Sequence, residues 1–442
     1  MLAGVQASVD LKRSVLVGNT LTYAASFLPV LILALESPGA LAFTDFYSAA
    51  TSVAKACALG GVGLYSVNVL LSSRNGYLDG VYGGLDNVYV IHHDKGLIAF
   101  MLLLIHPSLL ALRLAEDGLT DVVLFLLPSD SPAVNLGKLS LVLFSLVILL
   151  TIWGRLEYQR LLLAHKGLGA ILLIGALHAF TVGSDVSSLV VLKAYVGALV
   201  ALALLAYVNT TLLGNFVAEK HEYVVEKVEA PYEGLVSIRQ RPVGEKMVYE
   251  PGQFVFPRFH QDGFEEAHPF SVTSKASDDE LSLLVRPLGD YTAGLRGLRE
   301  GTRVTVEGPY GGFNYRRGGE RQVWVAGGIG VTPFIGMARA FEDDPSPPSV
   351  DMYYSYRGEG DQYLCRLMRG LLLANESCSF HGFDTSRTGR ITVEKVAETS
   401  DLEDVDIYLC GPKEMLEGLR RQFTRYGVKA EKIRVERFKL LA

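Results

Sequence analysis

The sequence predicts a multi-domain membrane protein: a six-helix transmembrane bundle, then a small antiparallel β-barrel domain, then an α/β domain. Three observations predict it. Residues 1–213 are apolar with charges confined to short loops, residues 214–318 contain short strand-type segments between Gly and Pro residues, and residues 319–442 alternate strand and helix patterns. Apolar segments of about 20 residues are typical of membrane-spanning helices, and the other two patterns are typical of barrels and of parallel sheets.

The composition argues against several classes of function. Of the 442 residues, 49% are hydrophobic and 20% are charged, and the formal net charge is −6. Because a protein that binds nucleic acid needs clustered positive charge, we expect no nucleic-acid partner. The four cysteines have no CxxC spacing, which argues against a zinc site or an iron–sulfur cluster.

Six apolar segments in the first domain have the length of a membrane span, although the fourth is short. Basic residues lie near the N-terminus and in the connections before the third and fifth segments, whereas the connection between the third and fourth is acidic. The positive-inside rule then places both termini and the soluble domains in the cytoplasm, with membrane lipid around the helices. The six segments are 15–36, 47–72, 88–115, 138–154, 161–183 and 187–213.

Four histidines lie in the third and fifth of these segments: His92 and His106, and His165 and His178. Imidazole is a frequent ligand of haem iron, and ionisable residues inside apolar spans are usually functional. The members of each pair are 14 and 13 residues apart, which is roughly 20 Å along a helix. Two parallel helices would hold two haems, with His92 and His165 at the inner level and His106 and His178 at the outer level.

Two points about these histidines stay open. His93 is 13 residues before His106 and therefore competes with His92 as the inner ligand. A 13-residue separation also turns the second side chain about 140° from the first, so the fifth span needs a distortion. Gly167, Gly169 and Gly175 provide room for one. The other interpretation is that the histidines only form hydrogen bonds between packed helices.

Residues 214–318 contain the motif His268-Pro269-Phe270-Ser271-Val272-Thr273-Ser274. Its order resembles the flavin-binding strand of the ferredoxin–NADP reductase superfamily, which usually reads Arg-x-Tyr/Phe-Ser/Thr. His in place of Arg is the variant of membrane ferric reductases and NADPH oxidases. The resemblance implies an FAD-binding β-barrel domain in which Phe270 lies on the isoalloxazine and Ser271 hydrogen-bonds the flavin.

Two further segments of this domain, 251–254 and 289–292, resemble the same superfamily. The second would place backbone groups and Thr292 beside the FAD pyrophosphate. The FAD-binding residues that the resemblance implies are His268, Pro269, Phe270, Ser271, Thr273 and Thr292.

Residues 319–442 begin with an apolar strand, a Gly-rich turn and the start of a helix. Gly327, Gly328 and Gly330 let the backbone approach a phosphate, and the following helix N-terminus favours negative charge. The spacing is not GxGxxG. The segment Gly-Gly-Ile-Gly-Val-Thr-Pro instead resembles the nicotinamide-nucleotide loop of the same superfamily, which implies an NAD(P)H-binding domain with Thr332 and Pro333 near the nicotinamide.

The second nucleotide signature is Cys410-Gly411-Pro412. By the resemblance, Cys410 would lie near the site of hydride transfer. In this superfamily an aromatic residue near the C-terminus covers the flavin face, and Phe438 is similar to it, although four residues follow Phe438 here.

Two arginines could bind the 2′-phosphate of NADPH, because a guanidinium pairs in bidentate fashion with phosphate. Arg357 follows the second strand of the α/β domain, and Arg390 lies in a polar loop. Glu359 and Asp361 lie beside Arg357, so NADH stays possible as the electron donor.

Over nearly its full length, the chain resembles a prokaryotic NADPH oxidase of the ferric-reductase-like superfamily, because the haem, flavin and nucleotide motifs occur in the expected order. The resemblance implies an enzyme of the bacterial cytoplasmic membrane that passes electrons from NADPH to FAD, through two b-type haems, to O₂ outside, producing superoxide. Bis-histidine ligation leaves no open iron position, so O₂ would react at the haem edge. No EF-hand loop or Pro-rich tail is visible, and we expect no obligatory protein activator.

Other functions are compatible with parts of the pattern. A ferric-chelate reductase would use the same electron path and differ in the acceptor. A haem-gated ion channel would need a chain of carboxylates inside the membrane domain, which the sequence lacks. A haem-free membrane anchor for a flavin reductase would lack the haem absorption band.

Overall fold

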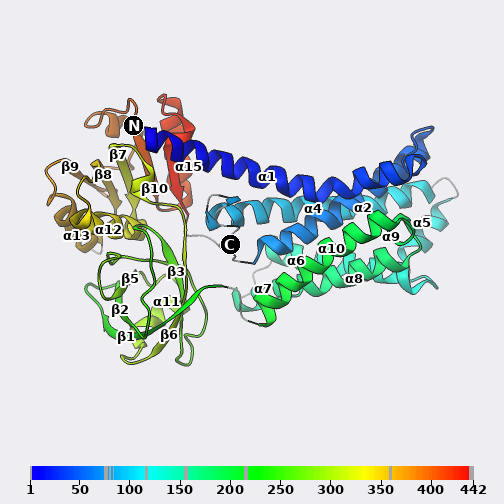
Figure 1. Ribbon diagram of the computed structural model, residues 1–442, viewed down its shortest axis with the longest axis horizontal. Coiled ribbons are helices and arrows are strands. Elements are labelled where there is room, and N and C mark those ends of the chain that lie inside the picture. The colour runs from blue at the N-terminus through cyan, green and yellow to red at the C-terminus, as the bar shows by residue number, and fades with distance from the viewer. Residues whose placement is uncertain are drawn as a thin grey trace. The chain divides into compact units, whose positions relative to one another are not determined.

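Figure 1 shows the computed structural model, which describes residues 2–73, 78, 81–82, 84–114, 118–153, 158–213, 218–357 and 361–437. The chain forms two compact units. One is helical and comprises Leu16–Leu78 and Asn87–Val217, and the other contains Ala218–Ala442 with Met1–Val15 and Asp79–Asp86. We call them the helical unit and the soluble unit. Each has hydrophobic core clusters of its own.

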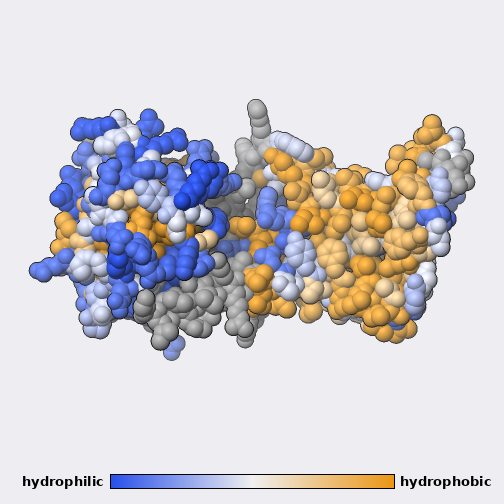
Figure 2. All heavy atoms as spheres, turned by 90° about the horizontal axis from the view of Figure 1, so that it is seen from above, coloured by the Kyte–Doolittle hydropathy of each residue, from blue (hydrophilic) through white to orange (hydrophobic). Residues whose placement is uncertain are grey.

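Among the residues that the structure describes, six helices are long and apolar enough to cross a membrane, as the sequence predicts. On the face seen in Figure 2 their outward side chains are mostly apolar, which suits contact with lipid tails. Small residues let neighbouring helices approach closely: a Cβ on Gly63 would lie 2.2 Å from the Ser26 carbonyl oxygen. The six spans are Leu16–Glu36, Phe46–Leu71, Asn87–Leu114, Pro132–Trp153, Leu163–Thr181 and Val190–Leu212.

The spans belong to the helices drawn in Figure 1. The short helix α9 (Asp185–Ser188) precedes the last span. The helices that carry the spans are α1 (Leu2–Glu36), α2 (Phe46–Leu71), α4 (Leu85–Leu114), α6 (Pro132–Trp153), α7 (Tyr158–Lys166), α8 (Leu168–Thr181) and α10 (Val190–Tyr207).

The structure differs from the predicted span boundaries around α6. This helix begins at Pro132 rather than at 138, so the fourth span is not short. Proline is favoured in the first turn of a helix, and the polar residues Asn135 and Lys138 interrupt the apolar pattern at the start of α6. An additional helix, α5 (Leu119–Leu126), lies in the acidic connection before it.

The fifth span has the distortion that the histidine spacing predicts. The regular helix is interrupted at Gly167, between α7 and α8. The backbone N–H of Gly167 donates to the Ala164 carbonyl, three residues back instead of four. His165 therefore belongs to α7 and His178 to α8.

The first part of the soluble unit is the predicted antiparallel barrel, with six strands in the order β4-β3-β6-β1-β2-β5. A bridge between Val272 and Leu283 links the end of β4 to β5, so the sheet is nearly closed. Alternate side chains along these strands point into one core, as the two-residue period of a strand requires. The strands are β1 (Lys220–Glu229), β2 (Val236–Pro242), β3 (Phe254–Phe259), β4 (Phe270–Ser271), β5 (Leu281–Val285) and β6 (Arg303–Tyr310).

The second part is a parallel sheet of five strands in the order β11-β10-β7-β8-β9. Helices cover both faces, as the apolar character of its central strands predicts. The strands are β7 (Arg321–Gly327), β8 (Ser349–Tyr356), β9 (Cys378–Asp384), β10 (Asp406–Cys410) and β11 (Ile433–Glu436), and the helices are α12 (Thr332–Arg339), α13 (Gln362–Leu372), α14 (Val393–Ala397) and α15 (Lys413–Arg425).

The two parts of the soluble unit are packed directly on one another. Leu235 of the barrel domain is fully buried in the core of the α/β domain. On α12, a Cβ on Gly336 would lie 2.5 Å from the carbonyl oxygen of Val272, at the end of the predicted flavin strand. Arg339 of the same helix donates to the Thr273 carbonyl at 2.8 Å. The predicted flavin strand and the helix after the Gly-rich loop are therefore neighbours.

Candidate functional site

The two histidines predicted for the inner level face each other. The ring centroids of His92 in α4 and His165 in α7 are 6.1 Å apart, with 63° between the ring planes. Nδ1 of His92 lies 3.0 Å from the Asn68 carbonyl oxygen. A carbonyl oxygen only accepts, so Nδ1 of His92 carries the proton and Nε2 keeps a free lone pair.

The two histidines predicted for the outer level also have their Nδ1 atoms hydrogen-bonded to backbone carbonyls. Nδ1 of His106 donates to the Ala54 carbonyl at 3.0 Å, and Nδ1 of His178 donates to the Ala133 carbonyl at 2.8 Å. The structure brings His92 and His165 together, and the pairing of His106 with His178 stays a prediction.

His92 fits the inner position better than its neighbour. The side chain of His93 is 71% exposed, and its ring lies beside Asp94. His92 is the one of the two that faces His165.

The geometry of the inner pair fits a haem iron between the rings. Two imidazoles that bind one metal ion at about 2.0 Å per nitrogen have ring centroids roughly 6 Å apart. The 6.1 Å between His92 and His165 matches this distance. Hydrogen bonds from the second ring nitrogen to a carbonyl are the usual way in which proteins orient a histidine ligand.

The predicted flavin strand carries a small polar cluster at its start. Nε2 of His268 lies 3.0 Å from a carboxylate oxygen of Glu266, and the His268 ring lies 4.0 Å from the ring of Tyr291, centroid to centroid. The Tyr291 hydroxyl donates to the Glu266 carbonyl at 3.0 Å. The motif around 268 and the motif around 291 are thus brought together, as a common cofactor site requires.

The remaining residues predicted to bind the flavin differ in how deeply their side chains are buried. Pro269 and Phe270 are half-buried, and Phe270 packs against the barrel core. Ser271 is buried, and the buried hydroxyl of Thr273 donates to the Ser282 carbonyl at 3.0 Å. The Thr273 hydroxyl therefore forms its hydrogen bond within the barrel.

Thr292 lies in the first turn of a short helix, α11 (Asp290–Gly294). Its hydroxyl oxygen accepts hydrogen bonds from the backbone N–H groups of Leu288 and Gly289 at 2.9 and 3.1 Å. These bonds fix the turn that the sequence pattern places beside a pyrophosphate.

The two predicted nucleotide motifs meet at the carboxyl edge of the parallel sheet, because β7 and β10 are adjacent strands. A Cβ on Gly330 would lie 2.7 Å from the Cys410 carbonyl oxygen and from Gly411, so only glycine permits this backbone contact. Gly327 similarly approaches Pro412. Ligands bind at the carboxyl edge in folds of this kind.

The other residues of these motifs are positioned by the backbone. Thr332 and Pro333 are buried in the first turn of α12, and the Thr332 hydroxyl donates to the Ile329 carbonyl at 3.0 Å. Gly328 has φ +56°, a conformation that favours glycine.

Cys410 is fully buried at the end of β10. Burial raises the pKa of its thiol well above the ordinary value, and the charge of Glu436 raises this pKa further. Glu436 lies beside Cys410 because it is the paired residue on β11. The thiol is therefore protonated at neutral pH, and it contributes shape rather than charge.

The two arginines predicted for the 2′-phosphate are exposed and follow adjacent strands. Arg357 comes directly after β8, and Arg390 lies in the loop after β9. Both are at the same carboxyl edge as Gly327 and Cys410. Phe438 lies outside the described residues.

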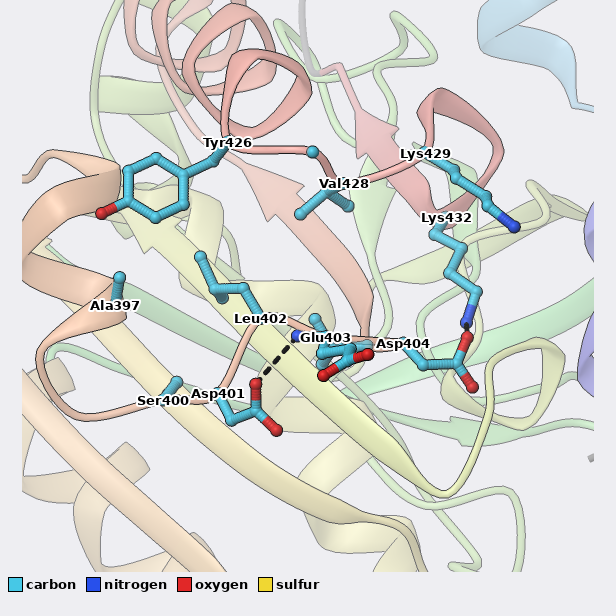
Figure 3. Close-up of a pocket in the computed structure, with 12 residues that line it drawn as sticks. Ala397, Ser400, Asp401, Leu402, Glu403, Asp404, Tyr426, Val428, Lys429 and Lys432 are labelled. Carbon is cyan, nitrogen blue, oxygen red and sulfur yellow. Dashed lines mark hydrogen bonds and ion pairs between the residues drawn. The ribbon is translucent and has the colours of Figure 1, made fainter.

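A pocket of about 610 Å³ lies elsewhere in the α/β domain, and Figure 3 shows the side chains that line it. Its walls come from residues 397–405 and 426–432, which precede β10 and β11. The cavity is therefore at the amino edge of the sheet, opposite the nucleotide motifs. The Asp404 carboxylate in its wall is paired with Lys432.

Sequence reasoning missed several contacts because they join distant parts of the chain. The carbonyl groups of Asn68, Ala54 and Ala133 have no sequence signal, since every residue carries one. Glu266 had a weak signal, because side chains two residues apart lie on the same side of an extended segment.

Three family profiles match the chain in the predicted order. A profile described as "Ferric reductase like transmembrane component" matches residues 57–176. An "FAD-binding domain" profile matches residues 223–314, and an "Oxidoreductase NAD-binding domain" profile matches residues 324–421. The first contains His92, His106 and His165, and the other two contain the flavin and nucleotide motifs described above.

Characterised relatives share parts of this arrangement. The reductase component of propane 2-monooxygenase from Mycolicibacterium smegmatis is 27% identical over 232 residues, which are 48% of this chain and 66% of the relative. Dual oxidase 2 from Sus scrofa is 28% identical over 229 residues, 47% of this chain and 14% of the relative. NADPH oxidase 3 from Homo sapiens is 29% identical over 167 residues, 33% of this chain and 27% of the relative.

The matched segments thus span less than two thirds of each of these three relatives. The chain joins a ferric reductase-like transmembrane component to an FAD-binding and a NAD-binding domain, an architecture similar to that of NADPH oxidases.

Proposed function

We propose that the chain is a transmembrane NADPH oxidase. It passes electrons from cytosolic NADPH through FAD and two bis-histidine b-type haems to O₂ on the outer side, producing superoxide. The single observation that carries the proposal is the close approach of His92 and His165, whose ring centroids are 6.1 Å apart. When bound, FAD accepts two electrons at once and the haems carry them singly, which is chemistry that side chains do not supply.

The four histidines hold and orient the haems in this proposal. For His92, His106 and His178, the Nδ1–H donates to a backbone carbonyl and the Nε2 lone pair is left for a metal. A neutral imidazole held in this way is a strong and well-oriented iron ligand.

The soluble unit holds FAD and the dinucleotide. His268 and Phe270 lie against the flavin in this proposal, with Ser271 and Thr292 as hydrogen-bonding groups. Cys410 lies near the nicotinamide, where its buried neutral thiol shapes the site. Phe438 covers the flavin face, as the resemblance implies.

In this proposal the dinucleotide is held by the two glycine-containing turns and by two arginine side chains. Arg357 and Arg390 bind the 2′-phosphate, which favours NADPH over NADH. The backbone turns that receive the rest of the molecule are formed by Gly327, Gly328, Gly330, Thr332, Pro333, Gly411 and Pro412.

The charge pattern of the connections supports a cytoplasmic position for both termini and for the soluble unit. The outer histidine pair then lies toward the external face of a bacterial cytoplasmic membrane. The enzyme needs no protein activator in this proposal and is active once its cofactors are bound.

A second function, ferric-chelate reduction, is favoured by one observation: the profile that matches the membrane helices is described as ferric reductase-like. The electron path is the same and only the final acceptor differs. Acceptor competition therefore separates the two functions.

The proposal is tested by haem content and reduction in the purified full-length protein. We expect two b-type haems per chain, a low-spin spectrum, and reduction of both haems by NADPH under anaerobic conditions when FAD is present. A protein that contains no haem, or whose haems NADPH does not reduce, would contradict the proposal.

A further inference from the structure

A lysine is buried in the helical unit one helical turn from the inner histidine of α4. Lys95 comes three residues after His92, and residues at this spacing are neighbours on a helix surface, with Cβ atoms about 5–6 Å apart. Lys95 is only 8% exposed, although it lies within the span Asn87–Leu114. A charged side chain inside a membrane domain is costly, so a functional role is the first interpretation to test.

The contacts of Lys95 leave its charge without a counter-charge. Its Nζ atom donates to the hydroxyl of Tyr23 in α1 at 2.8 Å and lies 4.2 Å from the centroid of the same ring. The neighbouring Asp94 is 63% exposed and lies beside His93 instead. Among the residues that the structure describes, Lys95 therefore contacts a neutral side chain and pairs with no carboxylate. Buried charges are normally paired, so this ammonium group suits an anion that the chain itself does not supply.

A second buried polar group near the inner histidine is also incompletely satisfied. The backbone carbonyl of Asn68 in α2 accepts the hydrogen bond from Nδ1 of His92. The side-chain amide of Asn68 lies against the residue after Lys95, because a Cβ on Gly96 would be 2.8 Å from Nδ2 of Asn68. Asn68 is 9% exposed, and its Oδ1 atom has no hydrogen-bond partner within the described part of the chain. Unsatisfied polar groups of this kind are typical of the wall of a site that receives a ligand.

A b-type haem has the charge that Lys95 lacks. With its porphyrin and its two propionates, a bis-histidine haem is an anion, and reduction of the iron makes it one unit more negative. A nearby cation therefore stabilises the reduced form more than the oxidised form, which raises the reduction potential. Because Lys95 is buried, water and salt screen its charge less than they screen the charge of an exposed lysine.

We infer that Lys95 is the counter-charge of the inner haem and raises the reduction potential of that haem, while Tyr23 holds the ammonium group in place. The inference rests on the proposed function, because it needs a haem between His92 and His165. The step that Lys95 favours is the addition of one electron from the reduced flavin to the ferric iron. No bond forms or breaks in this step.

The other interpretation is a lysine that only packs between α1 and α4. Such a lysine would affect the stability of the helical unit but not the potential of a haem. A lysine that extends along the lipid to the membrane surface would be exposed, whereas Lys95 is covered by protein. The potential of the inner haem therefore separates the two interpretations.

An anaerobic redox titration of the purified full-length protein, followed by haem absorption, measures this potential without turnover. The inner haem is the component that remains in His106→Ala. At a fixed potential we expect Lys95→Gln to lower the ratio of reduced to oxidised inner haem roughly tenfold, the effect of a unit charge about 10 Å away at an effective dielectric constant of about 20. For a one-electron couple this is a shift of about 59 mV to lower potential. The potential of the outer haem changes less.

Four further variants keep the test decisive. Lys95→Met, which is uncharged and of similar length, gives the same shift and serves if Lys95→Gln loses haem. Lys95→Arg keeps the charge and stays near the parent potential, and Tyr23→Phe removes only a neutral hydrogen bond and shifts the potential less than Lys95→Gln does. Lys193→Gln removes an exposed lysine from the first turn of α10 and leaves the potential of the inner haem unchanged. Haem content and melting temperature show whether each variant is folded.

The inference is wrong if Lys95→Gln and Lys95→Met keep the inner haem at the parent potential. It is also wrong if Lys95→Arg shifts the potential as far as they do, because the effect would then follow shape rather than charge. A protein that binds no haem would overturn the proposed function together with this inference. An unchanged potential in a protein that contains both haems would overturn this inference alone.

Discussion

The imidazole rings of His92 and His165 lie 6.1 Å apart, and the fifth span changes its helical path two residues after His165, at Gly167. The two facts are connected. In an uninterrupted helix His178 would point about 140° away from His165, so one helix could not present both rings to α4. The fifth span is interrupted at Gly167, between the two histidines, so the angle of an uninterrupted helix does not apply to it.

The level assignment predicts the haem content of single-histidine variants. We expect His106→Ala and His178→Ala each to lower the haem content from two to one per chain, because each removes a ligand of the outer haem only. The inner haem, still held by His92 and His165, remains reducible by NADPH. Pyridine haemochrome assays and anaerobic difference spectra measure both quantities, and His93→Ala is the matched control that keeps both haems. Loss of both haems from a folded His106→Ala protein would refute the assignment.

The close packing of α6 against α8 predicts a second effect on the outer haem. A Cβ on Gly137 would lie 2.8 Å from Cε1 and Nδ1 of His178. We therefore expect Gly137→Val to displace the His178 ring and to remove about half of the bound haem. Gly197→Ala is the control, because its Cβ would meet only Phe180, at an ordinary 3.6 Å. Full haem content in Gly137→Val would show that haem binding does not depend on the position of the His178 ring.

The contact between the two nucleotide turns predicts a binding defect. A Cβ on Gly330 would lie 2.7 Å from backbone atoms of Cys410 and Gly411, which cannot move aside as a flexible side chain does. Overpacking of this kind costs about 1–3 kcal/mol, so we expect Gly330→Ala to weaken NADP⁺ binding roughly tenfold or more. Gly418→Ala on α15, where the added Cβ meets open space, leaves binding unchanged. Equal affinities in the two variants would contradict the proposed place of the dinucleotide.

The raised pKa of the Cys410 thiol predicts slow alkylation and a particular dependence of stability on pH. In the unfolded chain this thiol ionises near pH 8.5–9, whereas in the folded chain it stays protonated to higher pH. The folded state then binds more protons, so the Cys410 contribution to stability is complete below about pH 8 and is lost as the pH rises above 9. We expect iodoacetamide to modify Cys410 at pH 8 only after unfolding, as measured by peptide mass spectrometry. Rapid modification of the folded protein would show a thiolate in this position.

Much of the fold follows from periodic patterns in the sequence. Apolar segments of span length and alternating strands predict the bundle, the barrel and the parallel sheet. The start of α6 at Pro132 was missed because Asn135 and Lys138 interrupt the apolar pattern of its first residues, and α5 was missed because it is shorter than a span. Local patterns fix elements well and their ends less well.

The candidate site could likewise be predicted from the sequence only in part. The histidine levels and the glycine turns could be predicted because spacing along one helix or one turn fixes their geometry. The pairs Glu266 with His268, Cys410 with Glu436, and Tyr23 with Lys95 depend on tertiary structure. The last pair joins residues 72 positions apart, and neither residue alone signals the other.

The measurement that tests the central claim most directly is the admission of air to NADPH-reduced protein. The full-length protein is loaded with FAD and haem, reduced anaerobically, and then mixed with air in the presence of a superoxide probe. The account predicts rapid haem reoxidation with formation of superoxide, at a rate that a ferric chelate does not increase. Haems that stay reduced in air but reoxidise when a ferric chelate is added would contradict it and would make the protein a metal reductase.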